Sequence, residues 1–249
     1  MDCLPRITPE QRRQFQEEGY FILPEVLPRA HLAMLREECD RFVALIDAEM
    51  DAAGVETQGI NHRSRRYFIA RRYRESAGMA EFLFSPLMAE ICRATLGETA
   101  YLFWEQFVVK CAEVGMAFQW HQDSGYVGHD HRPYLSCWCA LDDVNEENGT
   151  VSVLPFSRAG TRRREEHHRE SGSNDLVGYF GDDPGVPVVA PAGSIAVFSS
   201  VTFHRSGVNH TGQTRRVYLA QYSAEPILRK DGSGLWGLAE PVLAGGVRA

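Results

Sequence analysis

The feature that most constrains the fold is the triplet His121-Gln122-Asp123, which is followed far downstream by His204. In an extended segment side chains alternate between faces, so His121 and Asp123 point the same way while Gln122 points elsewhere. His204, about eighty residues on, can join them only if the intervening chain folds back, as it does in antiparallel β-topologies. The spacing therefore predicts an antiparallel fold that brings these three side chains together.

Strand-like runs separated by turns fill the second part of the chain. They cover residues 101–111, 134–141, 150–154, 194–199 and 216–223. Short strands of this kind, with irregular stretches between them, are typical of a double-sheet jelly roll. We therefore expect a mainly β fold whose core, about residues 99–225, is a double-stranded β-helix of the cupin-like kind.

The first part, about residues 1–98, has helical patterns. Thr8-Pro9-Glu10-Gln11 combines an N-cap residue, a proline at the first helical position and a glutamine three residues after the cap. Residues 20–23 are typical of a buried strand, and Ser85-Pro86 begins a helix that extends to Leu96. A longer helix from Pro28 carries one apolar stripe, formed by Leu32, Leu35, Cys39, Phe42 and Ile46. These helices should buttress the β-core.

Composition limits the class of protein. A chain of 249 residues, 44% hydrophobic and 24% charged, fits a single globular domain over 1–249. Its net charge of -7 argues against nonspecific nucleic-acid binding, which needs a basic surface. No apolar run is long enough to span a membrane, and the amino terminus lacks a leader pattern. We expect a cytoplasmic protein without nucleic-acid or membrane partners, either a monomer or a homodimer.

The six cysteines show no CxxC spacing and are expected to be reduced. Cys137 and Cys139 share one face of a predicted strand, which permits a metal role, but buried structural thiols are the preferred interpretation.

Residues 158–191 are polar and too long for an ordinary turn, so they predict an exposed insertion. It could act as a lid or substrate-recognition loop, but a solvated segment of mixed charge is favoured. The tail from Leu235 is expected to be loosely ordered.

Two imidazoles and one carboxylate suit non-haem Fe(II), because three protein ligands on one face leave positions open for a co-substrate and dioxygen. Arg215 meets a further need, since a planar guanidinium can hold the far carboxylate of a dicarboxylate co-substrate through two charge-assisted hydrogen bonds. The inferred co-substrate is 2-oxoglutarate.

Other histidines are less suitable as metal ligands than His204. The pair His129 and His131 could compete for the metal but falls in a predicted surface loop, and His210 lies in a segment with turn composition.

Several segments carry a resemblance to a known family. They are residues 120–126, 135–150, 153–158, 192–198 and 204–209, followed by Arg215-Arg216. In content and order they resemble the phytanoyl-CoA dioxygenase family of Fe(II)/2-oxoglutarate oxygenases, and the resemblance extends from about residue 17 to Tyr222. One departure is Pro155-Phe156-Ser157-Arg158, where the family often has Pro-Gly-Ser-His, and it alters a loop near the site mouth.

The resemblance implies roles for particular residues. His121, Asp123 and His204 would bind iron, whereas Arg215 and Ser206 would bind the far carboxylate of 2-oxoglutarate, with Arg216 as the fallback. Trp138 would lie beside the co-substrate.

The implied activity is dioxygen-dependent hydroxylation of an unactivated C–H bond, with release of succinate and carbon dioxide. Halogenating members replace the metal carboxylate with a small residue, so Asp123 favours hydroxylation.

Two alternatives remain open. The same ligands could support desaturation, epimerisation or cyclisation, or hold Zn(II) or Ni(II) in a cupin-like protein without oxygenase activity. The substrate is expected to be a natural-product, amino-acid-like or acyl small molecule. Five arginines between Arg63 and Arg72 could bind an anionic or carrier-linked substrate, or could form a solvated face paired to acidic helices.

Overall fold

The computed structural model of the chain describes residues 7–113, 115–171 and 175–249. Cys3 and the amino-terminal residues of the leader prediction lie outside the described residues. The helices are α1 (Pro9–Glu18), α2 (Arg29–Ala53), the 3-10 helix η1 (Tyr73–Glu75), α3 (Ala77–Leu83), α4 (Pro86–Thr95), α5 (Asp123–Val127) and α6 (Phe156–Ala159).

Two antiparallel sheets dominate the fold. The larger contains, in spatial order, β1 (Tyr20–Leu23), β12 (Ile195–Ser199), β7 (Leu135–Ala140), β14 (Arg215–Ser223), β5 (Ala100–Lys110), β4 (Arg66–Ala70), β3 (Asn61–His62) and β2 (Thr57–Gln58), with β15 (Glu240–Ala244) beside β5 and β16 (Val247–Arg248) beside β15. The smaller has the order β11 (Val186–Pro187), β8 (Val151–Leu154), β13 (Phe203–Ser206) and β6 (Phe118–His121). β9 (His168–Arg169) and β10 (Leu176–Val177) form a separate pair.

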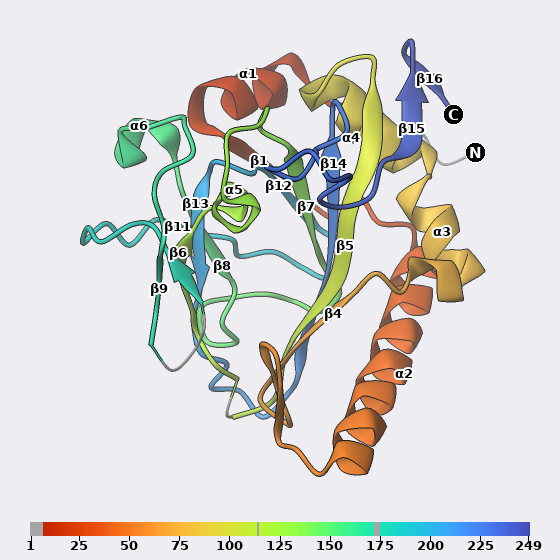
Figure 1. Ribbon diagram of the computed structural model, residues 1–249, viewed down its shortest axis with the longest axis vertical. Coiled ribbons are helices and arrows are strands. Elements are labelled where there is room, and N and C mark those ends of the chain that lie inside the picture. The colour runs from red at the N-terminus through yellow and green to blue at the C-terminus, as the bar shows by residue number, and fades with distance from the viewer. Residues whose placement is uncertain (1–6, 114, 172–174) are drawn as a thin grey trace.

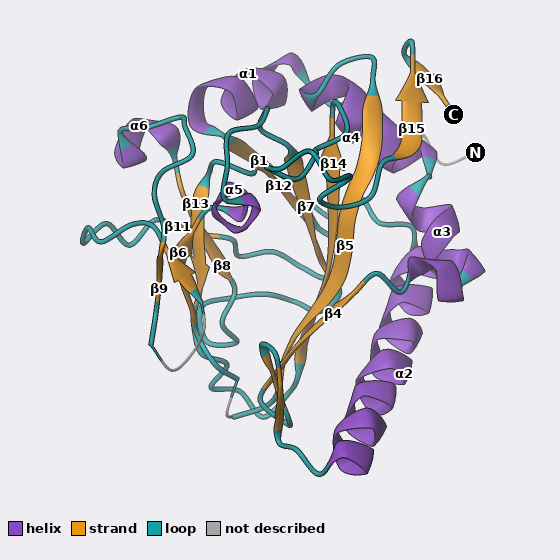
Figure 2. Ribbon diagram, in the orientation of Figure 1, coloured by secondary structure: helices purple, strands orange, loops and turns teal. Residues whose placement is uncertain are grey.

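The layers are visible in Figure 1, where the small sheet lies on one side of the large sheet and α2 and α3 lie on the other. Figure 2 shows α1 and α4 together at one end of the sheets. The predicted jelly roll with flanking helices is confirmed.

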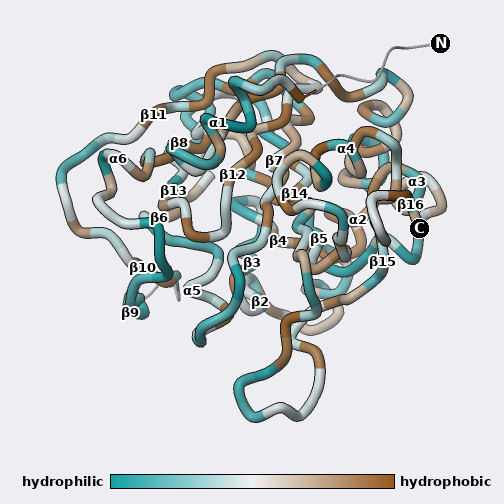
Figure 3. Tube along the Cα trace, turned by 90° about the horizontal axis from the view of Figure 1, so that it is seen from above, coloured by the Kyte–Doolittle hydropathy of each residue, from teal (hydrophilic) through white to brown (hydrophobic). Residues whose placement is uncertain are grey.

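The amino-terminal elements form as their caps and stripes predict. Thr8 caps α1 in a capping box with Gln11, and Gly19, at φ 81°, ends the helix. α1 buries no residue, and Figure 3 shows it as mostly hydrophilic. By contrast, α2 buries Leu35, Cys39, Phe42 and Ile46 against the large sheet. Burial of such apolar side chains is the main force that fixes the helix on the sheet.

Alternation along β14 decides which side chains enter the space between the sheets. Tyr218, Ala220 and Tyr222 pack into the core on the α2 side. Val217 and Leu219 pack into a second core, shared with β8 of the small sheet. Arg215 and Gln221 lie an even number of residues from Val217 and Leu219 along β14. Because side chains alternate between the two faces of a strand, all four point into the space between the sheets.

Cys137 and Cys139 are buried in the core on the α2 side of the large sheet. Burial raises the pKa of both thiols. The interpretation as buried structural thiols fits this environment, on the face opposite the inner space.

The prediction of a loosely ordered tail was wrong. β15 pairs with the part of β5 that β4 leaves uncovered, and Val242 and Leu243 are buried. The physical reason is the open ladder of β5, which offers backbone hydrogen bonds that the tail completes.

Most described residues of the segment 158–191 are exposed or partly exposed, but some of its residues are built into the core. β11 extends the small sheet, and Val188 is buried in the inner core. Asp175 is also buried, where both its oxygens accept hydrogen bonds from Arg66, at 2.8 and 3.0 Å. The polar residues of the segment are therefore partly paired inside the protein, a fact that residue composition alone does not reveal.

This buried pair predicts a stability effect. Asp175→Asn should lower the free energy of unfolding by about 3 kcal/mol, because it leaves the Arg66 guanidinium buried beside a neutral amide. Urea denaturation measures the change. The control is Asp51→Asn, which breaks the largely exposed ion pair with Arg63 and should cost much less. Equal losses in the two variants would contradict the prediction.

Candidate metal centre and co-substrate pocket

The topology brings His121, Asp123 and His204 to one point. β6 ends at His121, Gln122 stays extended at φ -109° and ψ 139°, and Asp123 begins the short helix α5. Because Gln122 is extended, its two neighbours project to the same side, as predicted, although Asp123 is helical. His204 lies on β13, directly opposite His121 in the antiparallel register.

The three side chains form a compact and nearly buried cluster. Oδ1 of Asp123 lies 3.9 Å from Nε2 of His121 and 3.6 Å from Nε2 of His204. One ligand atom from each residue lies within 4.8 Å of the others, which suits a single metal ion. No second group of three metal-binding side chains occurs in the described parts of the chain.

Backbone carbonyls orient both imidazoles. Nδ1 of His121 lies 2.7 Å from the carbonyl oxygen of Gln119, and Nδ1 of His204 lies 3.1 Å from that of Thr202. A proton on each Nδ1 satisfies these carbonyls and leaves each Nε2 lone pair for a metal. Burial, with His204 nearby, holds the pKa of His121 well below its usual value. His121 is therefore the neutral imidazole that a metal requires.

Two polar side chains of the large sheet orient the carboxylate. Oδ2 of Asp123 accepts hydrogen bonds from Ser136 Oγ at 2.5 Å and from Gln221 Nε2 at 2.9 Å. Gln221 also donates to Ser136 Oγ at 2.9 Å. These contacts occupy Oδ2 and leave Oδ1 facing the histidines. Ser136 and Gln221 were not predicted from the sequence. Alternation along the strands could have indicated both, because Gln221 lies on the same face of its strand as Arg215, and Ser136 on the same face as Trp138.

Gln221→Met tests this arrangement. It removes the donor to Asp123 while keeping side-chain length, and we expect iron affinity to fall by about 10- to 100-fold, as is usual for partners of metal ligands. Anaerobic iron titration measures it. The matched control is Gln213→Met, at an exposed position on the loop before β14. An affinity equal to that of the control would show that Gln221 does not support the ligand.

Gln122 points away from the cluster, as predicted, into the segment 158–191. Its side chain donates to the carbonyl oxygens of Arg163 and Val201 and accepts from the backbone N–H of Glu165. Its own N–H donates to Nε2 of His167 at 2.9 Å. The segment therefore braces the turn that presents two of the candidate ligands.

Arg215 lies in the cavity that also contains the cluster. This cavity has a volume of about 230 Å³, and Ser206 and Trp138 line it too. Arg215 is only 1% exposed, and its Nη2 donates to the carbonyl oxygen of Gly149 at 2.9 Å. Its Nε and Nη1 have no partner among the described residues. Burial lowers the pKa of Arg215 to about 10, so it is still a cation at neutral pH. A buried cation with two unfilled donors fits a carboxylate.

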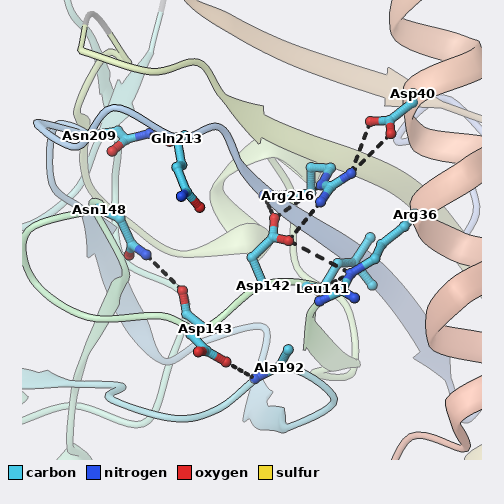
Figure 4. Close-up of polar contacts among 10 residues, drawn as sticks. All are labelled: Arg36, Asp40, Leu141, Asp142, Asp143, Asn148, Ala192, Asn209, Gln213 and Arg216. Carbon is cyan, nitrogen blue, oxygen red and sulfur yellow. Dashed lines mark hydrogen bonds and ion pairs between the residues drawn. The ribbon is translucent and has the colours of Figure 1, made fainter.

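Arg216 is directed toward Asp142 and toward Asp40 of α2, as Figure 4 shows. It binds Asp142 through Nη2 at 2.8 Å and Asp40 through Nη1 at 3.0 Å. Because its donors are committed to these carboxylates, the contacts favour Arg215 over Arg216 as the co-substrate anchor.

The competing residues have other partners. His129 and His131 do not belong to the metal-binding cluster; His129 Nε2 lies 2.9 Å from the carbonyl oxygen of Leu228, and His131 Nε2 lies 3.1 Å from Ser124 Oγ. In the arginine cluster, Arg63, Arg66 and Arg72 form ion pairs with acidic residues, which favours the structural interpretation for these three.

Comparisons with known proteins agree with this site. The family model of phytanoyl-CoA dioxygenase (PhyH) matches residues 15–217. A probable alpha-ketoglutarate-dependent hypophosphite dioxygenase of Stutzerimonas stutzeri is 24% identical over 95% of this chain and 86% of its own length. Methylphosphonate hydroxylase of Gimesia maris is 26% identical over 88% and 81%. The crystal structure of EvdO2 from Micromonospora carbonacea var. aurantiaca, complexed with 2-oxoglutarate, has a TM-score of 0.70 at 24% identity and covers 97% of both chains.

A jelly roll with an interior His-Asp-His cluster and a buried arginine in the same cavity defines the class of Fe(II)- and 2-oxoglutarate-dependent oxygenases. The chain belongs to the phytanoyl-CoA dioxygenase family and is an enzyme of this class, with iron, 2-oxoglutarate and dioxygen as its cofactor and co-substrates. A non-oxygenase metal site has no need of Arg215. Among the described residues, no helix combines the length and apolar character needed to cross a bilayer.

Proposed function

We propose that this protein hydroxylates an unactivated C–H bond of a small molecule, with His121, Asp123 and His204 as the iron ligands. Arg215 anchors the far carboxylate of 2-oxoglutarate, Ser206 assists it, and Trp138 forms a wall beside it. Bound iron, with 2-oxoglutarate and dioxygen, supplies the oxidation and releases succinate and carbon dioxide.

One observation carries the assignment of the co-substrate. Arg215 is buried in the cavity of the metal cluster, and two of its donor nitrogens, Nε and Nη1, have no partner in the described part of the chain. Buried polar groups are normally satisfied, so these donors favour a ligand that is itself anionic. A dicarboxylate that also reaches the metal meets this requirement.

The chain's own contribution is positioning. Ser136 and Gln221 fix the carboxylate, and the carbonyls of Gln119 and Thr202 fix the imidazoles. The cavity lining is mostly apolar, which favours the exclusion of water from the reacting C–H bond once a substrate fills the cavity. Desaturation, epimerisation and cyclisation need the same ligands and are alternatives to hydroxylation. The cytoplasmic location, the oligomeric state and an anionic or carrier-linked substrate stay predictions.

Succinate release tests the function. Protein supplied with Fe(II), 2-oxoglutarate and air should produce succinate slowly even without substrate, and faster when a substrate is present. The control is the same protein loaded with Zn(II), which should release none. Succinate formation that is independent of the metal, or absent from the iron-loaded protein with every substrate offered, would contradict the proposal.

A further inference from the structure

The cavity extends along β5 and β14, from Arg215 to a group of aromatic side chains. Arg215 pairs with Lys110 in register, and Gln221 pairs with Trp104. Residues six apart on a strand are separated by about 20 Å. Because Gln221 contacts Asp123, Trp104 lies beside the metal cluster at the end of the cavity remote from Arg215. This remote end is the space left for a substrate.

Aromatic rings from several elements line this substrate end. They are Trp104, Tyr126, Tyr134 and Trp236, whereas Phe68 and Phe118 line the cavity nearer Arg215 and Ser206. Phe118 and Tyr126 lie nearly parallel and each contacts the ring of His121, at centroid distances of 4.4 and 5.8 Å. Rings so close to a candidate iron ligand would contact the part of the substrate that reacts.

Trp236 reaches the cavity from the chain between β14 and β15. Its ring stacks on Phe103, with centroids 5.5 Å apart, and lies 5.8 Å from Trp104. The backbone N–H of Trp236 donates to the carbonyl oxygen of Ile227 at 2.8 Å, and the backbone N–H of Leu238 donates to the carbonyl oxygen of Phe103 at 2.8 Å. The ring is therefore a fixed wall of the cavity.

The substrate end offers no ionised side chain for a charged substrate among the described lining residues, once the metal cluster and Arg215 are set aside. Arg205 contributes to the lining, but its guanidinium lies 4.9 Å from the Trp120 ring and donates to the carbonyl oxygen of Pro184. Tyr126 and Tyr134 contribute phenol groups to the lining, and phenols are neutral at neutral pH. Arg71, whose guanidinium lies 4.9 Å from the Trp104 ring, is exposed and lies outside this lining. A charged substrate group buried within the lining would therefore lose its hydration without gaining a partner.

One amide provides a polar contact. Nε1 of Trp104 lies 3.4 Å from Oε1 of Gln106, and this contact orients the Gln106 side chain within the cavity. With its oxygen engaged, the amide nitrogen can donate to a substrate carbonyl or hydroxyl oxygen.

We propose that the substrate is an uncharged molecule with a flat ring system, and that Trp236 is the residue that selects for it. The ring system packs against Trp104 and Trp236, and an oxygen on it accepts from Gln106. This inference rests on the proposed function, because it places the substrate beside the iron site. It is an alternative to the anionic or carrier-linked substrate that the arginine cluster suggests.

Three probes of similar size test the substrate class. They are 2-acetylnaphthalene, which is neutral and flat; 2-naphthoate, which is flat but anionic; and 2-acetyldecalin, which is neutral but not flat. Binding to the protein loaded with Fe(II) and 2-oxoglutarate is measured without oxygen, by dialysis and by the change in the visible band of the iron-bound 2-oxo acid. We expect 2-acetylnaphthalene to bind about tenfold more tightly than either other probe.

Substitutions distinguish specific packing of the probe against Trp236 from nonspecific binding to exposed hydrophobic side chains. Trp236→Ala should weaken 2-acetylnaphthalene binding about tenfold, and Trp236→Phe should restore most of it, because a ring is retained. Phe180→Ala, at a ring that is 72% exposed, should have no effect. 2-Oxoglutarate affinity should be unchanged in all three variants.

The outcomes distinguish the two levels of the proposal. If the 2-oxoglutarate band forms but 2-naphthoate binds as tightly as 2-acetylnaphthalene, or Trp236→Ala changes nothing, the substrate class is wrong and the oxygenase function stands. If no band forms in the iron-loaded protein, the function itself fails, and this inference with it.

Discussion

Asp123→Ala should abolish turnover and lower iron affinity by more than about 100-fold, since a ligand should matter more than the residues that support one. The substitution removes the only carboxylate of the cluster and leaves two histidines. It also deprives Ser136 and Gln221 of their shared acceptor, which should cost about 1–3 kcal/mol of stability. Succinate release, anaerobic iron titration and thermal unfolding measure the three effects.

The matched control is Asp130→Ala, seven residues further on. Its side chain is 99% exposed and contacts Arg164 at 3.3 Å, away from the cavity. It should keep wild-type turnover and iron affinity. Full turnover in Asp123→Ala, under conditions where its fold is intact by circular dichroism, would overturn the assignment of the iron ligands.

Arg215→Gln should raise the KM for 2-oxoglutarate by about 100-fold, which corresponds to about 2.7 kcal/mol. The reason is the loss of a buried guanidinium, the only one among the described residues that line the cavity, together with its charge-assisted hydrogen bonds to a carboxylate. The iron concentration needed for half-maximal activity should stay unchanged, because Arg215 does not contact the cluster. Steady-state kinetics with each component varied in turn measures both quantities.

Arg216→Gln is the natural control, because the next residue of the same strand faces the other way. It breaks ion pairs with Asp142 and Asp40, so stability should fall slightly while the KM for 2-oxoglutarate stays the same. If Arg216→Gln raised this KM and Arg215→Gln did not, the anchor would be Arg216.

The sequence predicted the jelly roll and grouped the candidate ligands correctly, because both depend on local patterns. The alternation of His121 and Asp123 needs only an extended Gln122, and the structure keeps Gln122 extended even though Asp123 opens a helix. Alternation also separates Arg215 from Arg216, a choice that spacing from His204 had left open.

Contacts between residues that lie far apart in the sequence could not be predicted from local patterns. Trp236 reaches the cavity only because β15 pairs with β5, and the composition of the tail shows no sign of this pairing. Likewise, the composition of the polar segment 158–191 does not reveal its contacts with the rest of the protein. Asp175 forms a buried ion pair with Arg66, and the side chain of Gln122 forms hydrogen bonds with the backbone of Arg163 and Glu165. Residue type predicts exposure on average, but a buried ion pair or hydrogen bond reverses it.

Anaerobic titration of the iron-loaded protein with 2-oxoglutarate shows whether the His-Asp-His cluster holds an iron ion that a 2-oxo acid can chelate. A 2-oxo acid chelated to Fe(II) gives a weak visible charge-transfer band. The wild-type protein should develop this band to saturation, Arg215→Gln should require about 100-fold more 2-oxoglutarate, and Asp123→Ala should develop no band at the same iron concentration. A wild-type protein that binds iron yet shows no band at saturating 2-oxoglutarate would show that this cavity does not bind 2-oxoglutarate at the metal.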